Sequence, residues 1–152
     1  MPPRAFISGP LSTGPSQTYF KTHYIPKINT AIAKGHHFVI GPIPSGVDKE
    51  ALEYLLSYPV PPAHITIFVT STEDRMWGDM FRARGVRVHV VEGWEVTSGD
   101  RDAAMTAASV YDILRWRTEE EARAFYGSLY REGHVTNTER NWLRRVGEGS
   151  LG

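Results

Sequence analysis

The sequence predicts an α/β fold: a single Rossmann-like domain with a doubly wound, mainly parallel sheet and helices on both faces. Short apolar runs typical of buried strands alternate with stretches of helical periodicity along the chain. Several of these runs end in glycine, serine or proline, where a strand turns toward a helix. A length of 152 residues suits one domain of this kind. We therefore expect residues 1–152 to form one unit.

Three strands are expected in the amino-terminal half, at residues 5–7, 38–40 and 64–69. Residues 17–34 show a helical period, which Pro26 should kink or restart and which Gly35 should end. Another helix follows the second strand, and either Ser45 or Asp48 can cap it. This half is therefore predicted to alternate regularly between strand and helix.

The carboxyl-terminal half is predicted to continue the alternation. A loop beginning at Thr70 enters a helix that ends near Gly85. The later strands are expected at residues 86–91 and 111–116, and the later helices at 102–108, at 118–126 and from about Thr136 onward. Right-handed crossovers would connect these strands into one parallel sheet. Ligands of such sheets bind at the carboxyl ends of the strands, near the switch point, so we expect the site there.

Composition excludes several classes of function. The 17 basic and 17 acidic residues cancel, which leaves no electrostatic footprint for binding nucleic acid or an anionic membrane surface. Without cysteine the chain has no disulfide, thiolate metal site or thiol nucleophile. None of the six histidines belongs to a helical ligand pair, so no metal or other cofactor is expected. No apolar run approaches the roughly 20 residues of a membrane helix, and we expect a cytoplasmic protein.

Glycine and serine occur in the loops after the first two predicted strands. These candidate ligand-binding residues are Ser8, Gly9, Gly41, Ser45 and Gly46. Their backbone N–H groups can face a phosphate at a helix amino terminus. Alternatively, the glycines only make the tight turns that such a sheet needs. Neither loop matches a Walker or dinucleotide-binding glycine motif, so the loops alone do not identify a ligand.

Two charged residues near helix starts are candidates for chemistry. Arg101 lies where the helix macrodipole favours anions, so it is either incidental surface variation or a ligand contact. Thr136 and Glu139 have the spacing of a capping box. In the functional interpretation, Glu139 is instead a general base or stabilises an oxocarbenium ion, with N–H groups near Thr136 receiving a phosphate. Trp94 and Trp116 flank ligand-side loops and either pack or stack on a base.

Four segments in fixed order resemble the SLOG superfamily. They are residues 6–10, 40–51, 101–105 and 133–139. This Rossmann-like group includes the LOG ("Lonely guy") phosphoribohydrolases, the DprA proteins and the YspA/YpsA-like proteins. The resemblance spans about residues 4 to 145. It implies binding of a nucleotide or nucleotide-derived ligand at the carboxyl edge, with hydrolysis of its N-glycosidic bond.

The resemblance also implies roles for individual residues. Glu139 would be the catalytic carboxylate near the anomeric carbon, and Arg101 would orient the ribose or phosphate or assist the leaving base. Asp48 would hold a ribose hydroxyl or its own loop. The remaining residues expected to line the sugar-phosphate pocket are Ser8, Gly9, Gly41, Ser45, Gly46, Gly133 and Thr136.

Two other functions remain open. Val135 stands where LOG proteins have glycine, which favours a non-catalytic nucleotide sensor on the same fold. A nucleoside deoxyribosyltransferase-like enzyme is the other alternative, because its first strand and Ser-Gly-Pro turn look similar. It would need a carboxylate nucleophile on a helix of the pocket. We also expect a homodimer, because small side chains at Ala103, Ala104, Ala107 and Ala108 suit close helix packing, although they can pack on their own sheet instead.

Overall fold

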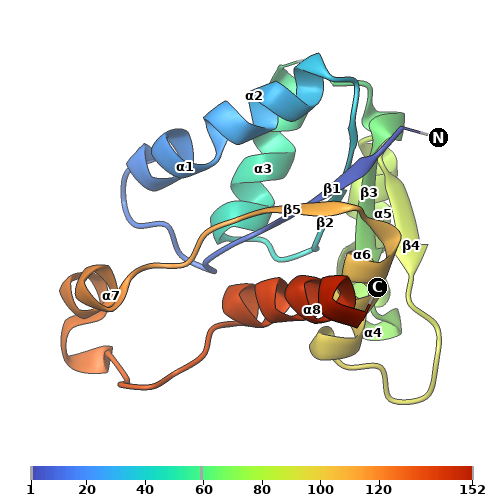
Figure 1. Ribbon diagram of the computed structural model, residues 1–152. Coiled ribbons are helices and arrows are strands. Elements are labelled where there is room, and N and C mark those ends of the chain that lie inside the picture. Colours follow the sequence, from blue (N-terminus) through green and yellow to red (C-terminus); the bar gives the residue numbers. More distant parts are fainter. Residues whose placement is uncertain (1, 59, 152) are drawn as a thin grey trace.

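The computed structural model describes residues 2–58 and 60–151 and confirms the predicted α/β fold. Its sheet has five strands, all parallel, in the order β4-β3-β2-β1-β5 (Figure 1). The strands are β1 (Arg4–Ser8), β2 (His37–Ile40), β3 (Ile65–Val69), β4 (Arg87–Val90) and β5 (Tyr111–Leu114). Each predicted strand is therefore present, with ends that shift by one or two residues.

The helices alternate with the strands as predicted. They are α1 (Thr18–His23), α2 (Ile25–Ala33), α3 (Gly46–Ser57), α4 (Ser71–Glu73), α5 (Asp79–Ala83), α6 (Ser98–Ala108), α7 (Glu119–Tyr126) and α8 (Asn137–Leu151). Shorter turns are η1 (Pro62–His64), the π-helical η2 (Asp74–Gly78) and η3 (Gly127–Leu129). Pro26 is the second residue of α2, where its missing N–H is not needed, so the helix restarts there as predicted.

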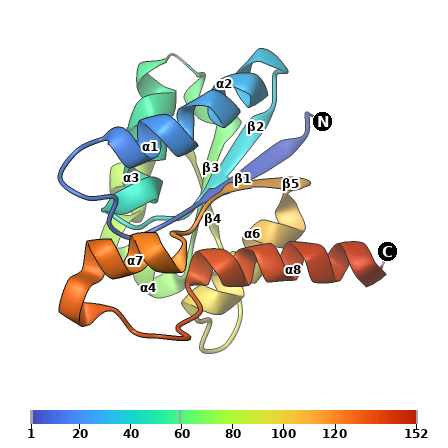
Figure 2. The same cartoon turned by 60° about the vertical axis from the view of Figure 1, so that its left-hand side comes forward.

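Helices cover both faces of the sheet (Figure 2). On one face, α1, α2, α3 and α5 contribute to the larger core cluster, in which Ile7, Ile40 and Ile67 of adjacent strands are fully buried. On the other face, Phe6 and neighbouring strand residues pack against Met105 of α6. Side chains alternate between the faces along each strand, which explains why consecutive apolar residues serve both cores.

The order of the strands creates a switch point at β1. From β1 to β4 each new strand joins the same side of the sheet, and the crossover through α6 then places β5 on the other side of β1. The connection after β1 therefore crosses one face of the sheet, whereas the connection that leads into β5, the parallel neighbour of β1, crosses the other face. In open α/β sheets this position is where a crevice forms.

Two element boundaries differ from prediction for identifiable reasons. The helix expected at 102–108 begins at Ser98, because Thr97 and Asp100 form a capping box: Asp100 N–H donates to Thr97 Oγ1 at 3.1 Å, and Thr97 N–H donates to Asp100 Oδ2 at 2.9 Å. The fifth strand ends at Leu114 instead of Trp116. There the backbone N–H of Arg115 donates to the hydroxyl of Tyr24 at 3.0 Å, outside the strand ladder.

Candidate functional site

A cavity lies at the carboxyl ends of β1 and β2, between the first turns of α3, α6 and α8. The cavity has an empty volume of about 410 Å³ when its open mouth is included. The part that the centre of a water molecule can occupy is much smaller, about 40 Å³. The interior therefore has room for a few waters. A ligand larger than that occupies the mouth or displaces side chains.

Six of the ten predicted site residues line this cavity. They are Ser8, Gly9, Gly41, Ser45, Asp48 and Arg101. They come from the ends of two strands and the starts of two helices, as the fold argument predicts for a site at this edge. The structure does not bring the other four predicted residues into the lining, namely Gly46, Gly133, Thr136 and Glu139.

Ser8, the last residue of β1, carries an unsatisfied hydroxyl in this cavity. The residue is 6% exposed, and its Oγ has no hydrogen-bond partner among the described residues. A buried hydroxyl without a partner is unfavourable by about 1–3 kcal/mol, so native proteins usually satisfy it with a water or ligand. Ser8 is therefore positioned to bind a polar group that enters the cavity.

Asp48 is held against the loop that follows β2. Its Oδ2 accepts a hydrogen bond from the backbone N–H of Ile43 at 3.3 Å. A Cβ atom at residue 41 would lie 2.6 Å from the same oxygen, so Gly41 leaves the space that the carboxyl group occupies. Burial raises the pKa of Asp48 to about 7, although the nearby Arg101 guanidinium opposes the rise. At neutral pH both the acid and the carboxylate are populated.

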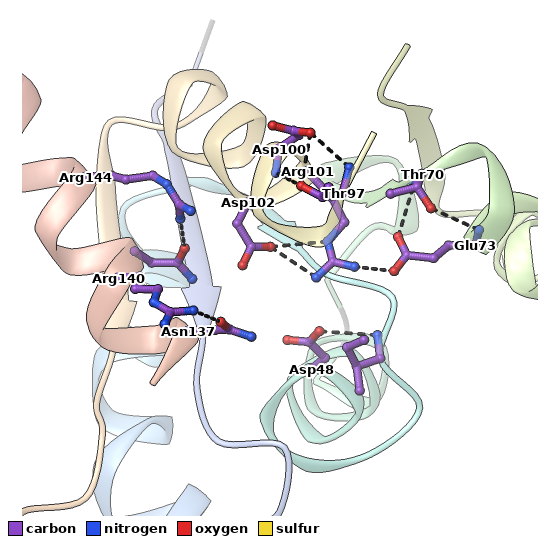
Figure 3. Close-up of polar contacts among 12 residues, drawn as sticks. Asp48, Thr70, Glu73, Thr97, Asp100, Arg101, Asp102, Asn137, Arg140 and Arg144 are labelled. Carbon is purple, nitrogen blue, oxygen red and sulfur yellow. Dashed lines mark hydrogen bonds and ion pairs between the residues drawn. The ribbon is translucent and has the colours of Figure 1, made fainter. Parts of the chain in front are cut away.

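Arg101 is buried between two carboxylates (Figure 3). It is 5% exposed, pairs closely with Glu73 of α4 and donates from Nε to Oδ1 of Asp102 at 3.2 Å. Glu73 is itself fixed by a capping box, because its Oε1 accepts the N–H of Thr70 at 2.9 Å. Arg101 is therefore a buried cation that is already paired with two carboxylates.

The wall of the cavity is acidic. Asp48 and Asp102 line it, and Glu73 pairs with Arg101, which is the only cation among the described residues of the lining. Burial raises the pKa of Asp102 as well, opposed by its contact with Arg101. Because Arg101 already has two acidic partners, this wall favours neutral hydroxyl or N–H groups over a phosphate.

The first turn of α8 approaches the cavity with amide and hydroxyl side chains. Asn137, Thr138 and Asn141 line it, and Asn141 is only 2% exposed. Thr136 caps the helix, since its Oγ1 accepts the N–H of Glu139 at 3.1 Å. Each helical residue turns by about 100°, so the side chain of Glu139 leaves α8 at a different angle from its neighbour Thr138. The structure therefore does not bring Glu139 into the cavity lining with Arg101; from α8 the lining residues are Asn137, Thr138 and Asn141.

Two predicted glycines serve turns instead of the cavity. Gly46 has φ +66°, and a Cβ there would overlap the backbone of Pro10 and Leu11. The next N–H, of Val47, donates to the carbonyl of Pro10 at 3.1 Å. Gly46 therefore lets α3 dock against the loop after β1. Gly133 has φ +74° in an exposed turn before α8.

Sequence reasoning missed Glu73, Asp102 and the polar residues of α8. A local signal exists for Glu73, because Thr70-Ser-Thr-Glu73 is a capping box directly after a predicted strand. Asp102 follows Arg101 in sequence and shares its helix start. For Asn141 no local signal exists, since its burial depends on how α8 docks.

In comparisons with known proteins, the chain matches no family model, and no curated protein or solved structure is significantly similar to it. Within residues 2–58 and 60–151, no three acidic or histidine side chains are grouped so that they could hold a metal ion. No helix in that part of the chain is long and apolar enough to cross a membrane.

Proposed function

We propose that the protein binds a nucleoside or a nucleoside-derived ligand at the carboxyl edge of its sheet and hydrolyses the N-glycosidic bond. One observation carries most of this proposal: the Asp48 carboxyl group lines a switch-point cavity with a pKa of about 7. Such a pKa suits proton transfer at neutral pH. The unsatisfied hydroxyl of Ser8 adds a contact for a polar ligand.

The two cavity aspartates divide the chemistry between them. Asp48 in its acid form donates its proton to the nitrogen of the departing base as the C–N bond breaks. Asp102, where the contact with Arg101 opposes the rise in pKa that burial causes, acts as its carboxylate: it stabilises the positive charge that develops on the sugar and accepts a proton from the attacking water. The new C–O bond then leaves a free sugar and a free base. Arg101 positions Asp102 in this scheme.

The acidic wall favours a nucleoside over its 5′-phosphate. A phosphate within the cavity would face Asp48 and Asp102, while Arg101 is already paired. Sugar hydroxyls, in contrast, can donate to carboxylates and bind the amide side chains of Asn137 and Asn141. We therefore expect base release from nucleosides to exceed release from the matching 5′-monophosphates.

Base release from a panel of nucleosides and 5′-monophosphates tests the proposal. Asp48→Asn should lower turnover by about 10²–10⁴-fold, the range for a lost acid–base group, without lowering the melting temperature. The wild-type rate should fall as pH rises through about 7, because Asp48 then loses its proton. Glu139→Gln serves as the control and should leave turnover unchanged. Unchanged turnover in Asp48→Asn together with a large loss in Glu139→Gln would return the catalytic role to Glu139.

A deoxyribosyltransferase-like activity is the second candidate. It is favoured by the placement of Asp48 on α3 and Asp102 on α6, because a transferase needs a carboxylate nucleophile on a pocket helix. Adding a second, isotopically labelled base to the reaction distinguishes the two activities. A labelled nucleoside product indicates transfer, and its absence with continued release of the first base indicates hydrolysis. Stabilisation by a nucleoside without any base release would favour the sensor.

The proposal includes assembly into a homodimer through α6. Ala103 and Ala107 are exposed on this helix, whereas Ala104 and Ala108 pack against the smaller core cluster on their own sheet. The exposed half of the small-residue surface is therefore left for a symmetry-related copy.

A further inference from the structure

A second hollow lies at the carboxyl end of β5, beside the cavity. It has a volume of about 510 Å³ and is lined by Asp112, Leu114, Arg115, Trp116 and Thr118, with Trp142 of α8 opposite. This volume falls within the usual range for sites that hold small molecules, about 300–1,000 Å³. We call these six residues the tryptophan groove.

The tryptophan groove adjoins the cavity at two places. Ser8, which lines the cavity, is the register partner of Leu114, which lines the groove. Adjacent strands are only about 4.8 Å apart. On α8, Asn141 lines the cavity and the next residue, Trp142, lines the groove. One ligand can therefore reach both hollows across the ends of β1 and β5.

The groove presents open aromatic surface. The ring centroids of Trp116 and Trp142 are 5.8 Å apart, and the angle between the ring planes is 55°. The two rings therefore contact each other and leave no slot between them for a third ring. Trp142 remains 42% exposed, which leaves indole surface open for another ring. Arg115 already has partners, because its Nη2 donates to Glu121 at 2.6 Å and its guanidinium lies 5.3 Å from the centre of the Tyr19 ring.

We infer that the tryptophan groove is the subsite for the planar heterocyclic base of the ligand whose sugar enters the cavity. This inference rests on the proposed function and specifies its substrate class: an N-glycoside with an aromatic base. The base stacks on the open indole surface of Trp142. In this arrangement the sugar lies at the mouth of the cavity, and the base extends from there into the larger tryptophan groove.

Indole N–H resonances in solution test the subsite directly. Free adenine and free uracil, which carry no sugar, should shift the resonances of Trp116 and Trp142 but not those of Trp77 and Trp94. Trp94 is the control for non-specific stacking, because it is 91% exposed on the loop before α6. Equal shifts at Trp94, or no shift at Trp116 and Trp142 with either base or with adenosine, would overturn the inference.

Binding measurements with variants separate this inference from the proposed function. Trp142→Ala should weaken adenosine about 5- to 150-fold, the loss expected for one stacked ring, and should leave methyl β-ribofuranoside, which lacks a base, unaffected. Trp94→Ala is the matched control and should bind both ligands like the wild type. Equal adenosine affinity in Trp142→Ala and wild type overturns the subsite while the function stands. If Asp48 variants keep wild-type riboside binding and turnover, and the free bases still shift the indole resonances, the proposed function is overturned while the subsite stands.

The exposed face of α8 offers one competing occupant, a second copy of the chain. Leu143 and Val146 are exposed beside Trp142 on this helix. If Trp142→Ala lowers the solution mass of the protein and the base shifts are absent, the tryptophan groove is an interface between copies, and the base subsite is wrong.

Discussion

At the scale of single residues, Asp48, the proposed proton donor, carries a carboxyl group whose burial is unfavourable for stability. Its carboxyl group lies against Gly41 and accepts a hydrogen bond from the backbone N–H of Ile43 at 3.3 Å. Burial therefore outweighs hydrogen bonding and raises the pKa to about 7. Proteins commonly accept such an unfavourable group where it is needed for proton transfer.

The pKa of Asp48 predicts how stability depends on pH. The folded protein binds the Asp48 proton more tightly than the unfolded chain does, so this group lowers the free energy of unfolding as pH rises from about 4 to about 7. Asp48→Asn removes this dependence and keeps an acceptor for the Ile43 N–H. The variant should therefore be more stable than the wild type above pH 7, by an amount on the order of a few kcal/mol, and similar to it near pH 4. Denaturant unfolding at several pH values measures the difference, and parallel curves for the two proteins would contradict the pKa assignment.

Arg101 is predicted to be essential for folding as well as for the site. Arg101→Ala leaves Glu73 and Asp102 as buried carboxylates without their partner, and breaking such a cluster is unfavourable by about 3–5 kcal/mol. Arg84→Ala is the matched control, because its pair with Glu53 is exposed and is worth about 0–1 kcal/mol. Chemical denaturation compares the two. Similar losses for both variants would show that burial does not distinguish these ion pairs.

At the scale of elements, α8 is attached to the domain mainly by polar contacts. Arg145 binds both carboxylate oxygens of Asp112, at 3.1 and 3.2 Å, and donates to the hydroxyl of Ser109 at 2.6 Å. Its Nη1 also donates to the carbonyls of Thr106 and Ser109. The apolar residues Trp142, Leu143 and Val146, in contrast, are exposed. Arg145 therefore anchors the helix that presents Asn137 and Asn141 to the cavity.

This attachment predicts that Arg145→Ala releases α8 while the sheet stays folded. Backbone amides of α8 should lose protection against hydrogen exchange, and nucleoside binding should weaken because the amide side chains leave the cavity. Arg140→Ala is the control, since the side chain of Arg140 donates to Asn137 at 3.3 Å, one turn away in the same helix, and so does not tie α8 to the sheet. Unchanged exchange of α8 in Arg145→Ala would mean that apolar packing holds the helix.

At the scale of the whole molecule, the open question is assembly. The exposed alanines of α6 predict a homodimer with twice the 17.1 kDa mass of one chain. Ala107→Arg should convert it to a monomer, because a long charged side chain prevents close approach of two helices. Ala83→Arg, an exposed change on α5, should leave the mass unchanged. Light scattering at micromolar concentration measures both, and a monomeric wild type would end the proposal.

The sequence by itself determined the fold and the edge of the sheet at which the cavity lies. Alternating apolar runs and helical periods specify strands and helices locally, and right-handed crossovers leave few topologies for a chain with this order of elements. Ser8, Gly41, Asp48 and Arg101 were recognised because each lies at a strand end or helix start, and parallel strands bring these positions to one edge.

Only the tertiary structure decided which side chains enter the cavity and in what state. Glu73 reaches Arg101 across 28 residues of sequence, a pairing that no local pattern encodes. The docking of α8 turns Asn141 inward while Glu139 lies outside the lining, because rotation about a helix axis is set by distant contacts such as Arg145 with Asp112. The pKa of Asp48 likewise depends on burial by several elements. Strand and helix formation are local, whereas helix rotation, ion pairing and desolvation arise only when the elements pack together.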